Sequence, residues 1–165
     1  MTLLDLADDA GPGRTACLDL YSRLAAGVTV VSAQGTDGAT GMTASSVTSV
    51  SLSPPLLLVS LAQQSRTLAA IRTRRTFAVH LLRSDQRPLA ERFSSGAGPR
   101  FRDVPHRKVL GAPVLEDALA WAVCLVEAEH RYGDHTLVIG RVASAHVDTG
   151  RPLLWHDRSF MELAS

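Results

Sequence analysis

A segment rich in hydroxyl groups and small side chains, residues 41–55, constrains this chain more than any other part of its sequence. It reads GMTASSVTSVSLSPP and ends on the pair Pro54-Pro55. Small side chains let a ligand approach the backbone, and hydroxyl and N–H groups can then bind a polar heterocycle or a phosphate. A strand that only filled a core would carry larger apolar residues on its inward face. The segment therefore indicates either a ligand-binding strand or a Ser/Thr-rich edge strand.

Most of the chain is predicted to form short strands joined by tight turns. The hairpin signal Thr36-Asp37-Gly38 follows a β-branched run, because Asp-Gly tolerates the positive φ of a tight turn. Tight connections favour antiparallel pairing, and closure removes the exposed edges of a long sheet, so we expect a small antiparallel β-barrel of about six or seven strands with a few peripheral helices. The main strands are expected at residues 28–33, 41–55, 56–61, 76–82, 119–130 and 136–147, and two short closing strands at 153–155 and 159–161.

Helical spacing of apolar residues predicts three short helices, near residues 17–24, after Ser65 and after Ser84. The two serines are placed to cap their helices, because a serine oxygen can accept from the free N–H groups of the first turn. Residues 94–113 contain several Gly and Pro and are expected to be irregular. A loop of this length in a compact domain often covers a functional site.

The composition is that of one ordinary globular domain, with 165 residues, 45% apolar and 20% charged. We expect residues 1–13 to be flexible and residues 14–165 to form the domain. The net charge of +1 argues against a nucleic-acid partner, and the basic run Arg72, Arg74 and Arg75 is interpreted as a solvated helix end. The chain has no apolar run of membrane-spanning length, no basic n-region, and two cysteines far apart in sequence, which predicts a cytoplasmic protein with reduced thiols and no membrane partner.

Several common catalytic motifs are absent from the sequence. It has no P-loop, no GxGxxG after a strand, no HExxH and no GxSxG, which argues against most nucleotide kinases, Rossmann dehydrogenases, zincins and α/β-hydrolases. The six histidines show no metal-ligand spacing on a helix face, so we expect no metal site.

Two short motifs could bind a ligand, and each has a structural alternative. Ser65-Arg66-Thr67 combines two hydroxyls, a guanidinium and the free N–H groups of a helix start, which suits a phosphate; simple N-capping would also explain the serine. Gly133-Asp134-His135-Thr136 places an imidazole where a turn becomes a strand, from which it can reach a pocket; it could equally be an incidental turn histidine.

In this order, the motifs resemble the short flavin reductases, the reductase components of two-component flavin-dependent monooxygenases, which have the FMN-binding split-barrel fold. The resemblance covers about residues 15–162. It departs from the family at His80, because relatives usually have Asn after Phe-Ala-Val. The motifs that carry it are the run 27–31, the hydroxyl-rich segment through Leu56, Ser65-Arg66-Thr67, Phe77-Ala78-Val79, Leu89-Ala90-Glu91-Arg92-Phe93, Gly111-Ala112-Pro113-Val114-Leu115, Gly133-Asp134-His135 and Pro152-Leu153-Leu154-Trp155.

The resemblance implies a homodimer that binds FMN or FAD and takes its hydride from NADH or NADPH. The residues implied for the isoalloxazine and ribityl chain are Thr43, Ala44, Ser45, Ser46, Ser49, Val50 and Ser51, with Ser65, Arg66 and Thr67 at the phosphate and Phe93 near the flavin. The residues implied for the nicotinamide are His135 and, on the side that completes its pocket, Asp157, Arg158, Ser159 and Phe160.

The activity implied by the resemblance is that of an NAD(P)H:flavin oxidoreductase whose reduced flavin leaves to serve a separate monooxygenase. Hydride transfer to flavin N5 needs two stacked rings and little acid–base help, so the lack of an obvious catalytic dyad is consistent with it. Three alternatives remain open: a flavin-binding protein of the same barrel without reductase activity, another split-barrel enzyme of the pyridoxine-phosphate-oxidase-like or deazaflavin-dependent type, and a non-catalytic carrier barrel for a small molecule.

Overall fold

The computed structural model describes residues 11–95 and 98–163, so most of the predicted flexible segment 1–13 lies outside the described residues. Its largest element is a seven-stranded antiparallel sheet, which confirms the mainly β fold class. In spatial order its strands are β3 (Gly38–Ala44), β2 (Thr29–Gly35), β6 (Thr76–Leu81), β9 (Ala120–Tyr132), β10 (His135–Val147), β5 (Pro55–Ala62) and β4 (Val47–Leu52).

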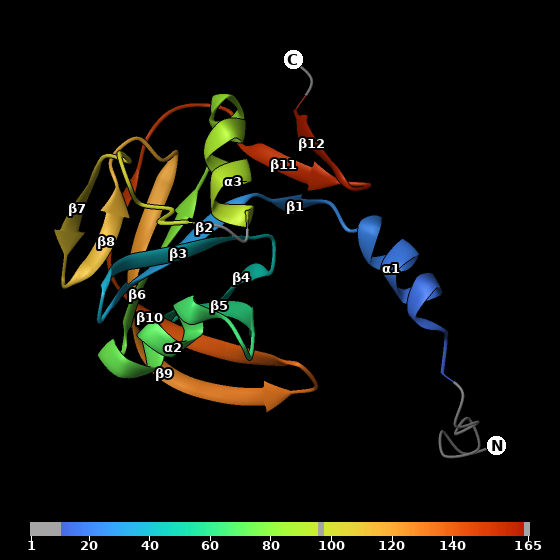
Figure 1. The fold of residues 1–165 in the computed structure, drawn as a ribbon, viewed down its shortest axis with the longest axis horizontal. Helices are drawn as coiled ribbons and strands as arrows, with labels where there is room; N and C mark the ends of the chain where they lie inside the picture. Colours follow the sequence, from blue (N-terminus) through green and yellow to red (C-terminus); the bar gives the residue numbers. More distant parts are fainter. Residues whose placement is uncertain (1–10, 96–97, 164–165) are drawn as a thin grey trace.

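Helices lie outside this sheet, as Figure 1 shows. Ser65 caps the second helix, as predicted, whereas the prediction for Ser84 is wrong, because that residue lies inside a 3-10 turn and Gln86 precedes the third helix. The helices are α1 (Arg14–Ser22), α2 (Arg66–Arg74) and α3 (Arg87–Ser94), and the 3-10 turn is η2 (Ser84–Gln86).

The hydroxyl-rich segment forms two strands instead of the single return strand predicted. β3 ends at Ala44 and β4 begins at Val47. Between them the chain bends toward β5. Two hydrogen bonds hold this bend: the Ser60 N–H donates to the Ser46 carbonyl, and the Ser46 hydroxyl donates to the Ser60 carbonyl. β3 and β4 therefore become opposite edges of the sheet, and no pairing joins them within the described residues. The sheet is therefore not closed, which agrees with the split barrel that the resemblance implies, whereas the closure that would remove every edge does not occur.

The loop expected at 94–113 contains a β-hairpin. A mostly exposed strand pairs there with a fully buried one, and the hairpin packs on the large sheet, where Ser32 donates its hydroxyl to the Pro113 carbonyl at 2.5 Å. The predicted closing strands β11 (Leu153–His156) and β12 (Ser159–Glu162) pair with each other, and β11 also pairs with a short strand that precedes β2. The strands that the sequence did not indicate are this short strand, β1 (Ala26–Gly27), and the two hairpin strands, β7 (His106–Val109) and β8 (Ala112–Leu115).

Apolar side chains of α2 hold this helix against the sheet. Leu68 and Ile71 are fully buried and pack with Val31 and Phe77. Burial of each such side chain contributes roughly 1.5–3 kcal/mol. The N-terminus of α2 therefore has a defined position beside β2 and β3. Among the described residues, no helix has both the length and the apolar character needed to cross a bilayer.

Candidate functional site

Part of the hydroxyl-rich segment is used by the fold itself. Thr43 donates its hydroxyl to the carbonyl of Ala90 in α3 at 2.6 Å, and Ser46 donates to the carbonyl of Ser60 in β5 at 2.7 Å. These bonds hold a helix and a strand in place. For these two hydroxyls, and for the edge position of β4, the interpretation of the segment as a Ser/Thr-rich edge strand is confirmed.

Other hydroxyls of the segment remain available. The side chains of Ser45 and Ser49 are exposed and make no hydrogen bond to any described residue. Val50 is also exposed, and the Ser51 oxygen accepts the N–H of Ser53 at 3.1 Å. Ser45 and Ser49 are therefore the hydroxyls best able to bind a ligand.

At the start of α2, only one of the three predicted phosphate-binding side chains is free. Ser65 accepts the N–H groups of Thr67 at 3.2 Å and Leu68 at 3.3 Å, so the capping interpretation is confirmed. Thr67 is buried with 2% exposure. Arg66 is exposed and makes no hydrogen bond or ion pair with a described residue. Its guanidinium is therefore available to an anion.

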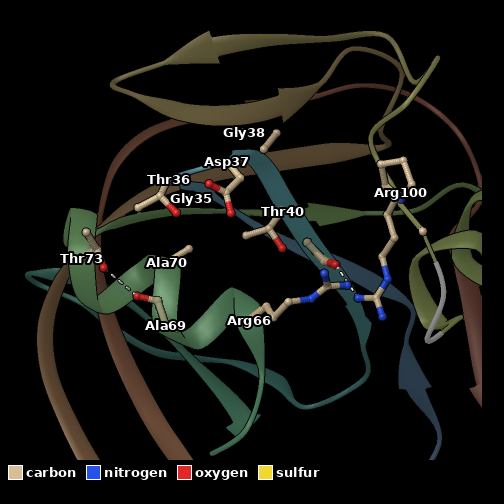
Figure 2. Close-up of a pocket in the computed structure, with 14 residues that line it drawn as sticks. Gly35, Thr36, Asp37, Gly38, Thr40, Arg66, Ala69, Ala70, Thr73 and Arg100 are labelled. Carbon is tan, nitrogen blue, oxygen red and sulfur yellow. Dashed lines mark hydrogen bonds between the residues drawn. The ribbon is translucent and has the colours of Figure 1, made fainter.

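Arg100 brings a second positive charge to Arg66. Its guanidinium donates to the carbonyls of Gly41 at 2.7 Å and Ser95 at 2.9 Å. Burial, and then the charge of Arg66, lower the pKa of Arg100. Figure 2 shows the two side chains reaching toward each other, and within the described residues neither is paired with a carboxylate. Two converging guanidinium groups without a carboxylate attract an anion.

These two arginines line a cavity of about 370 Å³ between the β2–β3 turn and α2. Asp37 and Thr40 point into the same space from the turn, as Figure 2 shows. Sequence reasoning missed Arg100, Asp37 and Thr40. The signal for Arg100 was the long Gly- and Pro-rich loop, but nothing in the spacing connects it to Arg66. Asp37 was assigned to the hairpin turn alone.

His135 lies at the same end of β5 as the start of α2. It pairs with Ala62, the last residue of β5, and the N–H of Gln63 donates to the Asp134 carbonyl at 3.0 Å. The His135 Nδ1 lies 2.8 Å from a carboxylate oxygen of Asp134, and this hydrogen bond lowers the pKa of Asp134. The structure thus brings the predicted nicotinamide residue and the predicted phosphate residues together.

Phe93 and Ala44, both predicted to touch the flavin, are buried. The Phe93 ring makes an edge contact with Phe101, with ring centroids 4.9 Å apart. A Cβ atom at Gly41 would lie 3.1 Å from the Phe93 ring, so β3 approaches α3 closely there and a larger residue would require the ring to shift. We assign Phe93 to the hydrophobic core and leave it out of the proposed site.

The segment 157–160 lies apart from His135. Asp157 and Arg158 form the turn between β11 and β12, and Ser159 and Phe160 begin β12. Figure 1 shows β11 beside α3, away from the tip of the β9–β10 hairpin. Asp157 forms an ion pair with Arg23 at 3.1 Å, and Arg158 forms one with Asp19. Within one chain, these predicted nicotinamide residues therefore anchor α1.

His80, the departure from the family pattern, connects two strands in the interior. It is fully buried, and its Nδ1 lies 2.9 Å from the Val30 carbonyl while its Nε2 accepts the N–H of Leu115 at 3.1 Å. This geometry requires the neutral ring with the proton on Nδ1. Burial lowers the pKa of His80 to about 4. The residue has a structural role and lies outside the candidate site.

At the C-terminal end of α2, two arginines are paired instead of free. Arg72 and Arg75 bind the two carboxylate oxygens of Glu129 at 2.9 and 2.8 Å, and Arg72 also donates to the Thr136 hydroxyl at 3.3 Å. All three arginines are exposed, so the interpretation as a solvated helix end is confirmed. Arg72 and Arg75 in addition connect α2 to β9 and β10, whereas Arg74 is unpaired among the described residues.

Comparison with known proteins identifies the family. The family model described as "Flavin reductase like domain" matches residues 21–164. An NADH-dependent flavin reductase from Rhodococcus sp is 41% identical over 146 residues, covering 86% of this chain and 81% of that protein. The reductase component of a 4-nitrophenol 4-monooxygenase/4-nitrocatechol 2-monooxygenase from Rhodococcus opacus is 35% identical over 142 residues, covering 86% of this chain and 77% of that protein.

A solved structure supports the same assignment. The NADH:FAD oxidoreductase of Streptomyces globisporus, in complex with NAD and FAD fragments, matches with a TM-score of 0.86 and 31% identity, covering 92% of this chain and 93% of that chain. The resemblance recognised from the sequence is confirmed: this chain belongs to the family defined by the flavin reductase like domain.

Proposed function

We propose that the protein is an NAD(P)H:flavin oxidoreductase that reduces FMN or FAD and releases the reduced flavin to a separate monooxygenase. Membership of the family supports this, and one observation carries it to particular residues. The unpaired Arg66 and the exposed His135 lie at the same end of β5, close to the turn at Ser45. A cation for phosphate, hydroxyls for a polar ring and an imidazole are thereby gathered in one place.

The residues present fit a flavin phosphate. Arg66 supplies a cation for the phosphate, while the Thr67 and Leu68 N–H groups are already bound by Ser65, and Ser45 and Ser49 offer hydroxyls to the ribityl chain or the ring. When bound, the flavin accepts a hydride at N5 from the reduced nicotinamide. The work of this chain is therefore to bind both nucleotides, to align their rings and to exclude water between them.

His135 is proposed to bind and orient the nicotinamide. Its hydrogen bond to Asp134 holds the ring at the hairpin tip, where 46% of its side chain is exposed. Segment 157–160 lies apart from this ring within one chain. If this segment also contacts the nicotinamide, it must come from a second copy.

A homodimer is proposed because segment 157–160 lies apart from His135 within one chain and because α1 is exposed. This helix extends from the body of the molecule in Figure 1 and has no buried residue. Leu20 and Tyr21 in this helix, and Leu24 just after it, are all more than half exposed. Apolar residues exposed on one helix are expected to be covered by a partner copy. Light scattering is expected to give twice the 17.6 kDa chain mass at micromolar concentration, and a monomer would contradict the proposal.

Two further proposals concern the extent of the domain and the location of the protein. We propose that residues 14–165 act as one unit and that the protein works in the cytoplasm, where Cys17 and Cys124, both free thiols, stay reduced. Limited proteolysis tests the first point and cell fractionation tests the second.

Anaerobic flavin bleaching tests the activity. Catalytic amounts of protein are mixed with FMN or FAD and then with NADH or NADPH, and the loss of oxidised-flavin absorbance is followed. Turnover with at least one pair is expected. Flavin binding without turnover would instead indicate a flavin-binding protein, and neither binding nor turnover would favour a carrier of another small molecule or a different split-barrel enzyme.

A further inference from the structure

We propose that the cavity between the β2–β3 turn and α2 binds the adenosine-diphosphate half of a dinucleotide, and that this dinucleotide is FAD. The inference deepens the proposed function and rests on it, because it names the flavin that the site prefers. Four features of the cavity support it: its charge, its polar end, its apolar wall and its position along β3.

The charge at one end of the cavity suits a pyrophosphate. Arg66 and Arg100 converge there, and within the described residues no carboxylate neutralises either side chain. FMN has a single terminal phosphate, whereas FAD has two linked phosphates, each of which remains charged at neutral pH. Two guanidinium groups can each bind one phosphate of a pyrophosphate.

The other end of the cavity suits a ribose. The Asp37 carboxylate and the Thr40 hydroxyl enter it from the β2–β3 turn, as Figure 2 shows, and neither makes a hydrogen bond to a described residue. A free carboxylate can accept hydrogen bonds from both ribose hydroxyls. A phosphate group alone would leave these acceptors unused.

The middle of the α2 wall carries small apolar side chains. Ala69 and Ala70 line the cavity there, and Gly35 and Gly38 line it from the ends of β2 and β3. The volume of about 370 Å³ lies within the range of small-molecule pockets. Small side chains on both walls leave room for an adenine ring between them.

The position of the cavity favours FAD over a nicotinamide dinucleotide. The first half of β3, residues 38–41, lines the cavity, and Thr43 and Ala44 in its second half lead to the turn at Ser45. A flavin lying along β3 with its ring near Ser45 would have its phosphates at Arg66 and its adenosine in the cavity. The proposed nicotinamide residue, His135, is on the other side of the α2 start and does not line the cavity.

Filling the cavity tests the inference. Ala69 is exposed on α2 and outside the buried core, so Ala69→Phe should block the cavity without disturbing the fold. Arg74→Phe is the matched control, because it adds the same ring to an exposed, unpaired position of α2 that does not line the cavity. Calorimetry measures the dissociation constants of ADP, FAD and FMN for the wild type and both variants, and thermal melting checks folding.

We expect the wild-type protein to bind ADP, and to bind FAD about tenfold or more tightly than FMN. Ala69→Phe should abolish ADP binding and weaken FAD to the level of FMN, with FMN affinity changed by less than about twofold. Arg74→Phe should change none of these. Asp37→Asn, which adds no bulk, should weaken FAD binding several-fold without affecting FMN binding. If Ala69→Phe does not fold, this variant tests whether the cavity binds the adenosine of FAD.

The remaining outcomes separate the possible failures. If Ala69→Phe raises KM for NADH with FMN as acceptor and leaves FAD affinity unchanged, the cavity binds the adenosine of the nicotinamide nucleotide and the assignment to FAD is overturned. If the wild type binds no ADP and binds FAD and FMN equally, the inference is overturned while flavin reduction stands. If no flavin is reduced but ADP binds and Ala69→Phe abolishes it, the proposed function fails and the adenosine-diphosphate site stands.

Discussion

Polar side chains between β2, β6 and β8 are buried and bonded to backbone groups, whereas several around the start of α2 are exposed and have no protein partner. His80 bridges the Val30 carbonyl and the Leu115 N–H, and no buried side-chain oxygen or nitrogen among the described residues lacks a hydrogen bond. The side chains of Arg66 and Asp37, in contrast, make no hydrogen bond or ion pair with any described residue.

The difference separates polar groups that folding requires from those that folding leaves free. A buried polar group without a partner costs about 1–3 kcal/mol, so the interior must be satisfied. An exposed charge is hydrated and can remain without a protein partner at little cost. The free groups near α2 are therefore those that a ligand can use. The Arg72–Glu129–Arg75 cluster is intermediate, because it is partly exposed but fully paired.

The largest expected effect concerns the buried histidine. Burial lowers the pKa of His80 from 6.5 to about 4. Below pH 6.5 this histidine therefore becomes protonated in the unfolded chain, whereas in the folded chain it stays neutral down to about pH 4. The contribution of His80 to stability is therefore constant above pH 6.5 and falls by roughly 3 kcal/mol as the pH drops to 4.

Urea unfolding at several pH values measures this loss. His80→Asn keeps a donor and an acceptor but does not titrate, so it should remove this part of the pH dependence. An equal acid dependence in the variant would show that the buried histidine is not responsible, and would weaken the contrast between the two regions.

The next effect concerns the free cation. Arg66→Gln should weaken FMN by about 1.5–3 kcal/mol, or one to two decades in dissociation constant, because a charge-assisted hydrogen bond to phosphate is lost. Riboflavin, which has no phosphate, should bind as before. Fluorescence titration of both ligands measures the effect. Equal losses for the two ligands would mean that Arg66 acts on the fold, contrary to the comparison.

A smaller effect is expected at the hairpin tip. His135→Ala should raise KM for the reduced nicotinamide about two- to tenfold, the range of one ordinary hydrogen bond, and leave flavin affinity unchanged. His130→Ala is the matched control, since His130 is an exposed histidine of the same hairpin whose side chain has no partner among the described residues. Lower thermal stability with unchanged kinetics would make His135 a brace of the turn.

The smallest effect concerns the paired cluster. Glu129→Gln leaves Arg72 and Arg75 without a counter-charge and should lower stability by about 1 kcal/mol or less, because these ion pairs are partly exposed. The loss should shrink at high salt. Flavin affinity should not change. Chemical unfolding at two salt concentrations measures the first expectation, and a clear loss of flavin binding would show that the cluster serves the site.

Local patterns were enough for much of the fold. The turn at Asp37-Gly38, the cap at Ser65 and the strands of β-branched residues follow from neighbours in sequence, and the structure has them where they were expected. The division of the hydroxyl-rich segment was missed, because the bend after Ala44 depends on bonds between Ser46 and Ser60. The β7–β8 hairpin was missed because Gly and Pro dominate its surroundings.

For the site, the sequence identified segments but not the state of each side chain. By itself it determined the family, the mainly β fold and the chemistry present in each motif, because these depend on local periodicity and on ordered short motifs. The tertiary structure decided which of these groups are free. Thr43 is bonded to Ala90, 47 residues away, and Arg72 to Glu129, 57 residues away, while Arg66 has no such partner. Partners this far apart meet only when the chain folds, so the identity of the available cations and hydroxyls is a property of the fold.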